Sequence, residues 1–162
     1  MKKLLCILII CFIFFASANA EEKTNAEIEK SLTRLDQVIA KNPKNAKNYV
    51  ERGDIYYLLN EHHKAVADYT AALTLDKNLD TAYFGRGLAY GRMGLVEEGI
   101  SDLSVYIARH PDSSVAYTKR GVRNIWHGDM LAAKHDLTLA VALDPTNAEA
   151  HDDLGVVHAK KQ

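Results

Sequence analysis

Residues 114–147 read SVAYTKRGVRNIWHGDMLAAKHDLTLAVALDPTN, and this stretch is one copy of a pattern that recurs every 34 residues. Four glycines share one position of the pattern and all three prolines share another: Gly53, Gly87, Gly121 and Gly155, then Pro43, Pro111 and Pro145. A fixed period of this length indicates an array of units that bury a core by stacking on their neighbours. The units begin at Ala46, Asp80, Ser114 and Ala148, and positions below are counted within a unit from these residues.

Each unit carries two apolar stripes with helical spacing. The first stripe, at positions 4, 8 and 11, places aromatic residues around the glycine, as in Tyr49, Gly53 and Tyr56. The second stripe, at positions 20, 24 and 27, alternates small and large apolar residues, as in Ala133 and Leu137. The pattern therefore predicts two antiparallel helices per unit, A and B, with a left-handed residue at position 15 in the turn between them: Asn60, Gly94 or Gly128.

The recurring aromatic, glycine, alanine and proline positions resemble those of the tetratricopeptide repeat (TPR) family. The resemblance implies an all-α fold, a right-handed superhelical solenoid of antiparallel helix pairs. It covers three full units, 46–79, 80–113 and 114–147, and a partial fourth unit at 148–162 that serves as a C-terminal capping helix. Residues 21–45 are predicted to contain an N-terminal capping helix, which opens with the capping-box pattern Thr24-Asn25-Ala26-Glu27.

A pair of opposite charges recurs with the units. Position 7 is arginine and position 23 is aspartate in all three full units: Arg52, Arg86 and Arg120, with Asp68, Asp102 and Asp136. The partial fourth unit has Leu154 at position 7 instead. We therefore predict an ion pair that joins helix A to helix B within each unit. Because the pair repeats, its expected role is structural and not catalytic.

The first twenty residues have the features of a secretory signal peptide. Lys2 and Lys3 precede an apolar run at 4–15, and Ala18-Asn19-Ala20 matches a small-x-small cleavage site. The run is shorter than the roughly 20 apolar residues that span a bilayer, so cleavage is favoured over an uncleaved membrane anchor. We therefore expect a periplasmic or secreted protein with no stable membrane span after signal cleavage.

Composition argues against several classes of function. The formal net charge is −1, which provides no basic field for a nucleic acid. Cys6 and Cys11 are the two cysteines and no histidine pair has the spacing of a metal site, so we expect no metal and no cofactor. His151 and His158 stand at positions 4 and 11, where core packing is expected. The sequence has no nucleophile elbow and no phosphate loop, so we expect no catalytic residues and no enzymatic activity.

The face of helix A opposite its packed stripe is left for function, because A helices line the concave side of such an array. It carries an apolar and aromatic floor flanked by two cations, and these residues are the predicted partner-binding groove: Tyr57, Phe84, Leu88, Arg92, Lys119, Val122, Ile125 and Trp126. Tryptophan, tyrosine and arginine are typical anchors of protein interfaces. The alternative is that Trp126 packs on the neighbouring unit. The pair Arg123-Asn124 has no role in this pattern.

TPR proteins that bind the acidic carboxyl-terminal tails of chaperones carry a clamp of lysine, asparagine and arginine across three consecutive A helices. The positions that match this clamp are Val50, Asp54, Gly85, Val115 and Lys119. Only Lys119 is basic, and Asp54 would repel a carboxylate. The resemblance therefore does not extend to chaperone-tail binding.

We accordingly expect a non-catalytic, exported scaffold or adaptor that holds a protein or peptide partner in a shallow concave groove, within envelope assembly or secretion machinery. This cellular context follows from the resemblance alone. The alternative is a structural protein that forms homo-oligomers through the groove or the ends of the solenoid. A third hypothesis is an enzyme subunit that lacks its catalytic partner.

Overall fold

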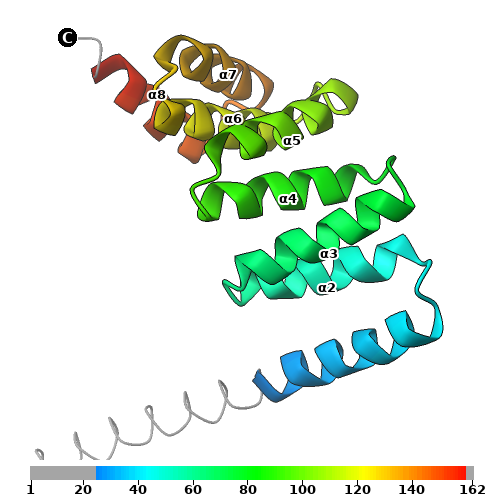
Figure 1. The fold of residues 1–162 in the computed structure, drawn as a ribbon. Coiled ribbons are helices and arrows are strands. Elements are labelled where there is room, and N and C mark those ends of the chain that lie inside the picture. The colour runs from blue at the N-terminus through cyan, green and yellow to red at the C-terminus, as the bar shows by residue number, and fades with distance from the viewer. Residues whose placement is uncertain (1–24, 160–162) are drawn as a thin grey trace, which may run out of the picture. The chain divides into compact units, whose positions relative to one another are not determined.

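The computed structural model describes residues 25–159, which are helical apart from the turns and short connections between helices. The helices are an N-terminal one over residues 25–41, then α2 (Ala46–Leu58), α3 (His62–Leu75), α4 (Asp80–Arg92), α5 (Val96–Arg109), α6 (Ser114–His127), α7 (Met130–Leu143) and α8 (Ala148–Ala159) (Figure 1). The chain divides into two compact units, Met1–Asn42 and Pro43–Gln162. The predicted signal peptide at 1–20 and Thr24 of the capping box lie outside the described residues.

Within Pro43–Gln162, helices α2, α4, α6 and α8 begin at the four residues at which the sequence pattern starts its repeats. The Asn45 side chain accepts a hydrogen bond from the backbone N–H of Lys47, and Ser113 accepts one from Ala116. Such caps satisfy backbone donors that the first turn of a helix leaves without a partner. The A-to-B turns contain the predicted left-handed residues, with φ of 59° at Asn60, 76° at Gly94 and 91° at Gly128.

The helices of this compact unit pack as consecutive pairs, α2 with α3, α4 with α5 and α6 with α7, and α8 packs against α7 (Figure 1). The A helices α2, α4, α6 and α8 also approach one another in turn, whereas the described helices α3, α5 and α7 make no close backbone approach to one another. The A helices therefore form the more closely packed row. A surface on this row receives side chains from several successive repeats.

The glycine at position 8 determines how closely the two helices of a repeat approach. A Cβ atom at Gly53 would lie 3.0 Å from the ring of Tyr69, and one at Gly121 would lie 2.8 Å from Leu137. Tyr69 and Leu137 stand at position 24 of their units, on helix B, and are fully buried. The repeated glycine thus provides the space into which the large side chain of helix B packs, as the two predicted stripes require.

Gly85 is a second close approach, this time between successive repeats. A Cβ atom at Gly85 would lie 2.5 Å from Cζ of Tyr69, a buried ring whose hydroxyl donates a hydrogen bond to Asp54. Gly85→Ala is therefore expected to lower the free energy of unfolding by about 1–3 kcal/mol, because the ring must leave its packed position. Urea denaturation measures the change.

Gly155 in α8 supplies the matched control for this substitution. No atom of the described residues lies within 4 Å of a Cβ atom at Gly155, so Gly155→Ala is expected to add only helix propensity, about 0.5–1 kcal/mol in favour of folding. Equal gains of stability in both variants would show that the Tyr69 ring does not limit the side chain that residue 85 can carry.

Candidate functional site

The three predicted ion pairs are present in the structure. In each repeat, the arginine donates from Nε and Nη2 to the two carboxylate oxygens of the aspartate, at 2.8 and 2.7 Å for Arg120 and Asp136. Arg120 also donates from Nη1 to the Ser104 hydroxyl of the preceding repeat at 3.0 Å. Bidentate pairs of this kind are strong and directional. They hold helix A to helix B and one repeat to the next, which is a structural role.

Asn124 belongs to the same network. It stands at position 11, where the first two repeats have tyrosine, and its Nδ2 donates a hydrogen bond of 3.1 Å to Asp136. Asp136 thus accepts three hydrogen bonds while only 2% of its side chain is exposed. The repeat pattern assigns Asn124 no role, and the structure places it in the buried polar core of the third repeat.

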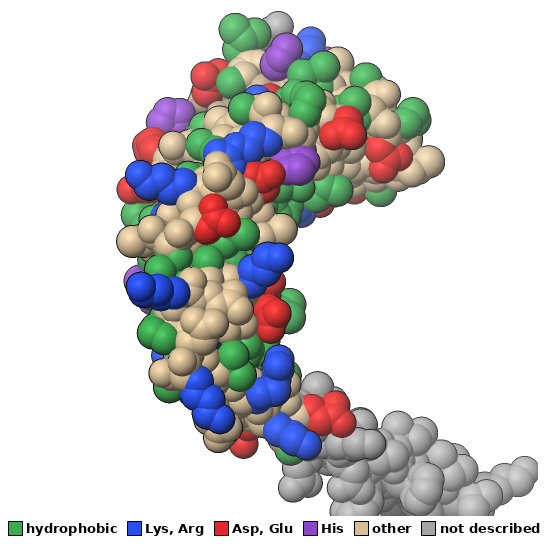
Figure 2. Space-filling model, turned by 90° about the vertical axis from the view of Figure 1, so that its right-hand side faces the viewer, with side chains coloured by type: hydrophobic (Ala, Val, Ile, Leu, Met, Phe, Trp, Pro, Cys, Tyr) green, Lys and Arg blue, Asp and Glu red, His purple; other side chains and the backbone are tan. Residues whose placement is uncertain are grey.

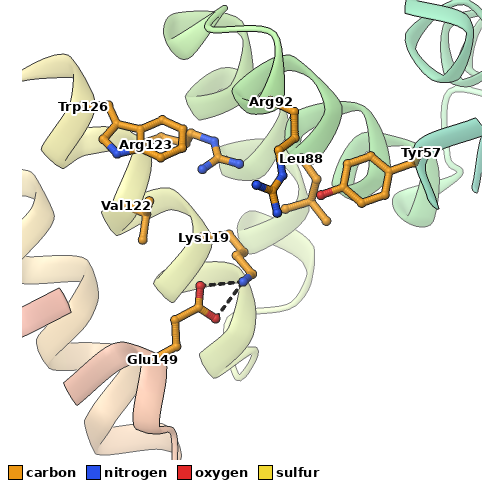
Figure 3. A pocket seen from close by; sticks show the side chains of 8 residues that line it. All are labelled: Tyr57, Leu88, Arg92, Lys119, Val122, Arg123, Trp126 and Glu149. Atoms are coloured by element: carbon orange, nitrogen blue, oxygen red, sulfur yellow. Dashed lines mark hydrogen bonds and ion pairs between the residues drawn. The ribbon is translucent and has the colours of Figure 1, made fainter. Parts of the chain in front are cut away.

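A pocket of about 140 Å³ lies on the A-helix row. Its walls come from α2, α4, α6 and α8: Tyr57, Leu88, Arg92, Lys119, Val122, Arg123, Trp126 and Glu149. Figure 3 shows these side chains converging on a common space from helices that are distant in the sequence. Its volume is below the roughly 300–1,000 Å³ of typical small-molecule sites. The pocket therefore suits one side chain of a larger partner.

Six of the eight predicted groove residues line this pocket, while Phe84 and Ile125 lie outside it. The Phe84 ring packs against the ring of Tyr106 on α5, with 4.9 Å between centroids. Ile125 packs against the apolar cluster formed by α7 and α8. Both side chains are half-buried against other helices, so they do not form part of the floor.

Trp126 is the exposed aromatic residue of the pocket. It is 54% exposed, although it is a large apolar side chain. Trp126 is therefore not a buried core residue. Its ring instead faces the Arg123 guanidinium on the same helix, 4.6 Å from the ring centroid.

Arg123 is the pocket residue that the sequence pattern missed. It is 5% exposed, and its Nε atom has no hydrogen-bond partner among the described residues. Burial lowers the pKa of Arg123, and the like charge of Arg92 lowers it further. Figure 3 shows the guanidinium extending from α6 toward Arg92 on α4. An arginine with an unpaired Nε at such a depth is costly to keep charged.

Gly91 provides the space for this arginine. A Cβ atom at Gly91 would lie 1.7 Å from Nε of Arg123. Gly91 stands at position 12 of its repeat, where the first and third repeats have Tyr57 and Ile125. A glycine in place of a large residue, one repeat before an arginine at position 10, is the sequence signal that could have located the pocket.

Arg92, Lys119 and Glu149 complete the charged wall. A side-chain hydrogen bond with Tyr57 raises the pKa of Arg92. Lys119 donates from Nζ to both carboxylate oxygens of Glu149, at 2.6 and 2.7 Å, as the dashed lines of Figure 3 mark. The pocket therefore holds three cations and one carboxylate, and that carboxylate is already paired.

The positions that match the chaperone-tail clamp are occupied differently. The Asp54 carboxylate accepts a hydrogen bond of 2.7 Å from the Tyr69 hydroxyl, and burial raises the pKa of Asp54. Val50 is buried, and Gly85 lies against the Tyr69 ring, where a longer side chain would collide with it. Asp54 and Gly85 are thus engaged with Tyr69, and the cations available on this row are those around Arg92 and Arg123.

A second pocket, of about 240 Å³, lies between α5, α6 and α7. Its lining combines apolar residues with the ion-pair network: Ile100, Ser104, Arg120, Asn124, Ala132, His135 and Asp136. The Arg120 guanidinium and the Asp136 carboxylate are already paired with each other. This pocket therefore presents no unpaired buried charge to a ligand, and we do not assign it a site.

The remaining expectations concern histidines, metals and membranes. His151 and His158 are exposed, so the expected core packing is wrong; no following helix packs on α8 in the described part of the chain. Among residues 25–159, no three His, Cys, Asp or Glu side chains are grouped as metal ligands. Over the same range, no helix has the length and apolar character of a bilayer span.

Figure 2 shows acidic and basic side chains interspersed over one face.

Replacement of Arg123 by an apolar residue is expected to stabilise the fold. Arg123→Met should raise the free energy of unfolding by about 1–2 kcal/mol, because it removes a buried charge with an unpaired Nε and keeps much of the volume. Urea denaturation provides the comparison. Arg120→Met on the same helix is the matched control and should be destabilising, because it breaks the pair with Asp136. A loss of stability in both variants would mean that the favourable contact of Arg123 with Trp126 outweighs the free-energy cost of burying its charge.

Comparison with known proteins agrees with the repeat pattern. A TPR repeat model matches residues 53–94, and a tetratricopeptide repeat model matches residues 81–113. The matches to tetratricopeptide repeats thus extend over residues 53–113. The TPR array is also similar to solved structures: the MamA crystal structure (TM-score 0.81, 19% identity, 87% of this chain and 82% of that chain) and the first TPR of Spaghetti (RPAP3) bound to HSP90 peptide SRMEEVD (TM-score 0.68, 24% identity, 71% and 91%). These likenesses confirm the predicted all-α fold class.

Among curated proteins, the TPR array is similar to the Hsp70-Hsp90 organizing protein of Triticum aestivum. The two are 24% identical over 128 residues, which cover 79% of this chain and 22% of the relative. The chain spans about a fifth of the length of curated relatives such as this one.

Proposed function

We propose that this TPR protein is a non-catalytic scaffold or adaptor whose pocket on α4 and α6 receives a side chain of a protein or peptide partner. The observation that carries the proposal is Trp126, the single tryptophan of the chain, which stays more than half exposed beside the buried Arg123. Tryptophan and arginine are the residue types that contribute most binding energy in protein interfaces. The small volume of the pocket favours an anchoring side chain over a free metabolite.

Similar TPR domains support a peptide as the partner. The first TPR of Spaghetti (RPAP3) is bound to an HSP90 peptide, and the second TPR domain of human RPAP3 is in complex with an HSP70 peptide. The present chain has Asp54 and Gly85 at two of the clamp positions. Our proposal is therefore a peptide held by the α4 and α6 pocket, with no assignment to those chaperone tails.

The proposed place of action is outside the cytoplasm, in the periplasm or as a secreted protein, within envelope assembly or secretion machinery. Support comes from the sequence of residues 1–20, with Lys2 and Lys3 before an apolar run and Ala18-Asn19-Ala20 after it. Fractionation of the source cells tests this part: mature protein that begins at Glu21 should appear with the envelope or in the medium. Full-length protein in the cytoplasm would contradict it.

Site-specific photo-crosslinking tests the binding proposal. A photoreactive residue is placed at Trp126, and a matched probe replaces Leu131, a highly exposed apolar residue on α7, which contributes nothing to the pocket. We expect one partner protein to be captured in the envelope fraction by the Trp126 probe and not by the Leu131 probe.

The capture must also depend on the pocket itself. The second substitution Leu88→Arg, which fills the pocket floor, should abolish capture by the Trp126 probe. Capture only of a second copy of this chain would favour the self-associating alternative. Equal capture by both probes would contradict the proposed binding site.

A further inference from the structure

Arg123 is a buried arginine whose Nε lacks a hydrogen-bond acceptor in the described part of the chain and whose charge faces an aromatic ring instead of a carboxylate. Its Nε is buried without a hydrogen-bond partner among the described residues, and its guanidinium lies against the Trp126 ring. Gly91 leaves the space that its side chain occupies, because any Cβ there would overlap Nε. By contrast, the repeat arginines Arg52, Arg86 and Arg120 each have an aspartate on helix B.

The charges around Arg123 do not balance within the pocket. Arg92 on α4 faces it, and the two like charges oppose each other. Glu149 is the acidic residue in the pocket lining, and Lys119 binds both of its oxygens. An anion placed between the two guanidinium groups would relieve their repulsion and accept charge-assisted hydrogen bonds from them.

We propose that Arg92 and Arg123 bind a carboxylate of the partner polypeptide, an aspartate or glutamate side chain or a terminal carboxylate. This inference rests on the proposed function and specifies the chemistry of the partner at that site. Arginine suits a carboxylate because its planar fork offers paired donors. Leu88, Val122 and the Trp126 ring give an apolar border for the neighbouring part of the partner. Neither arginine stands at a position that matches the chaperone-tail clamp.

Selection of peptides tests the inference even while the partner is unidentified. The chain from Glu21 is used to select from a displayed library of random peptides, presented with free N-termini and, in a parallel library, with free C-termini. Enriched sequences are synthesised, and their affinities are measured by the fluorescence of Trp126, which is the single tryptophan of the chain.

The expected result is a recurring acidic position or a free terminal carboxylate in the enriched peptides. Replacement of that group by its amide should weaken binding at least ~10-fold, the loss of a charge-assisted pair. Arg92→Gln and Arg123→Gln should each lower the affinity for the acidic peptide by a similar factor and leave the affinity for the amide peptide nearly unchanged. Lys77→Gln makes the same change of net charge at an exposed residue outside the pocket and should alter affinity less than ~2-fold.

The outcomes separate the two proposals. Enriched peptides that bind equally as acids and amides would overturn the carboxylate site and leave the proposed function standing. If the wild-type chain enriched no peptides beyond those that the Trp126→Ala variant enriches, the proposed function itself would be contradicted. Because Arg92 is exposed, Arg92→Gln keeps the test valid even if Arg123→Gln fails to fold.

Discussion

Asp136→Ala is expected to lower the free energy of unfolding by roughly 3–5 kcal/mol. The side chain is almost fully buried and accepts hydrogen bonds from Arg120 and Asn124. Its removal leaves a guanidinium and a buried amide without their acceptor, and such orphaned groups cost far more than the pair contributes over an apolar alternative. Urea denaturation monitored by circular dichroism gives the value.

Two controls locate the source of this effect. Asp112→Ala changes the same charge at an exposed residue in the connection before α6 and should change stability by less than about 0.5 kcal/mol. Asp68→Ala breaks the equivalent pair of the first repeat, which lacks the third hydrogen bond from an asparagine, and should cost less than Asp136→Ala. A loss below about 1 kcal/mol for Asp136→Ala would show that the repeated pairs contribute little.

Trp126→Ala is expected to weaken partner binding by about 30-fold or more. Anchoring tryptophans at the centre of interfaces cost about 2 kcal/mol or more when truncated, which corresponds to this factor. The substitution removes the ring that lies against Arg123, so it affects both the apolar contact and the position of the guanidinium. Isothermal titration with the partner captured by the Trp126 probe measures the loss.

The helices should remain folded in this variant, because Trp126 is more than half exposed. Leu131→Ala is the matched control: it also truncates an exposed apolar residue, but on α7 and outside the pocket, so its affinity should stay within ~2-fold. Similar losses in the two variants would indicate a general effect on the array, and an unchanged affinity for Trp126→Ala would remove Trp126 as the anchor.

The repeat geometry could be predicted because its causes recur in the sequence. Gly121 packs against Leu137 in the same way that Gly53 packs against Tyr69, so one period of 34 residues contains the packing rule for all three repeats. The ion pairs were predictable for the same reason, since an arginine and an aspartate that always appear together must lie together.

The composition of the pocket was only partly predictable, because it depends on departures from the repeat. Arg123 is buried only because Gly91 of the preceding repeat leaves room for it, and neither residue recurs. Phe84 has the helical position of a floor residue, yet it packs against Tyr106, which fills a position that holds alanine in the first and third repeats. Periodicity assigns a residue to a face of its own helix, whereas these contacts depend on the neighbouring helix.

A crystal structure of the chain with a bound segment of the captured partner would locate the binding site. We expect the segment to lie along α4 and α6, with one side chain in the pocket against Trp126 and within van der Waals distance of Leu88 and Val122. A partner bound to the faces of α3, α5 and α7, with the pocket unoccupied, would contradict this expectation.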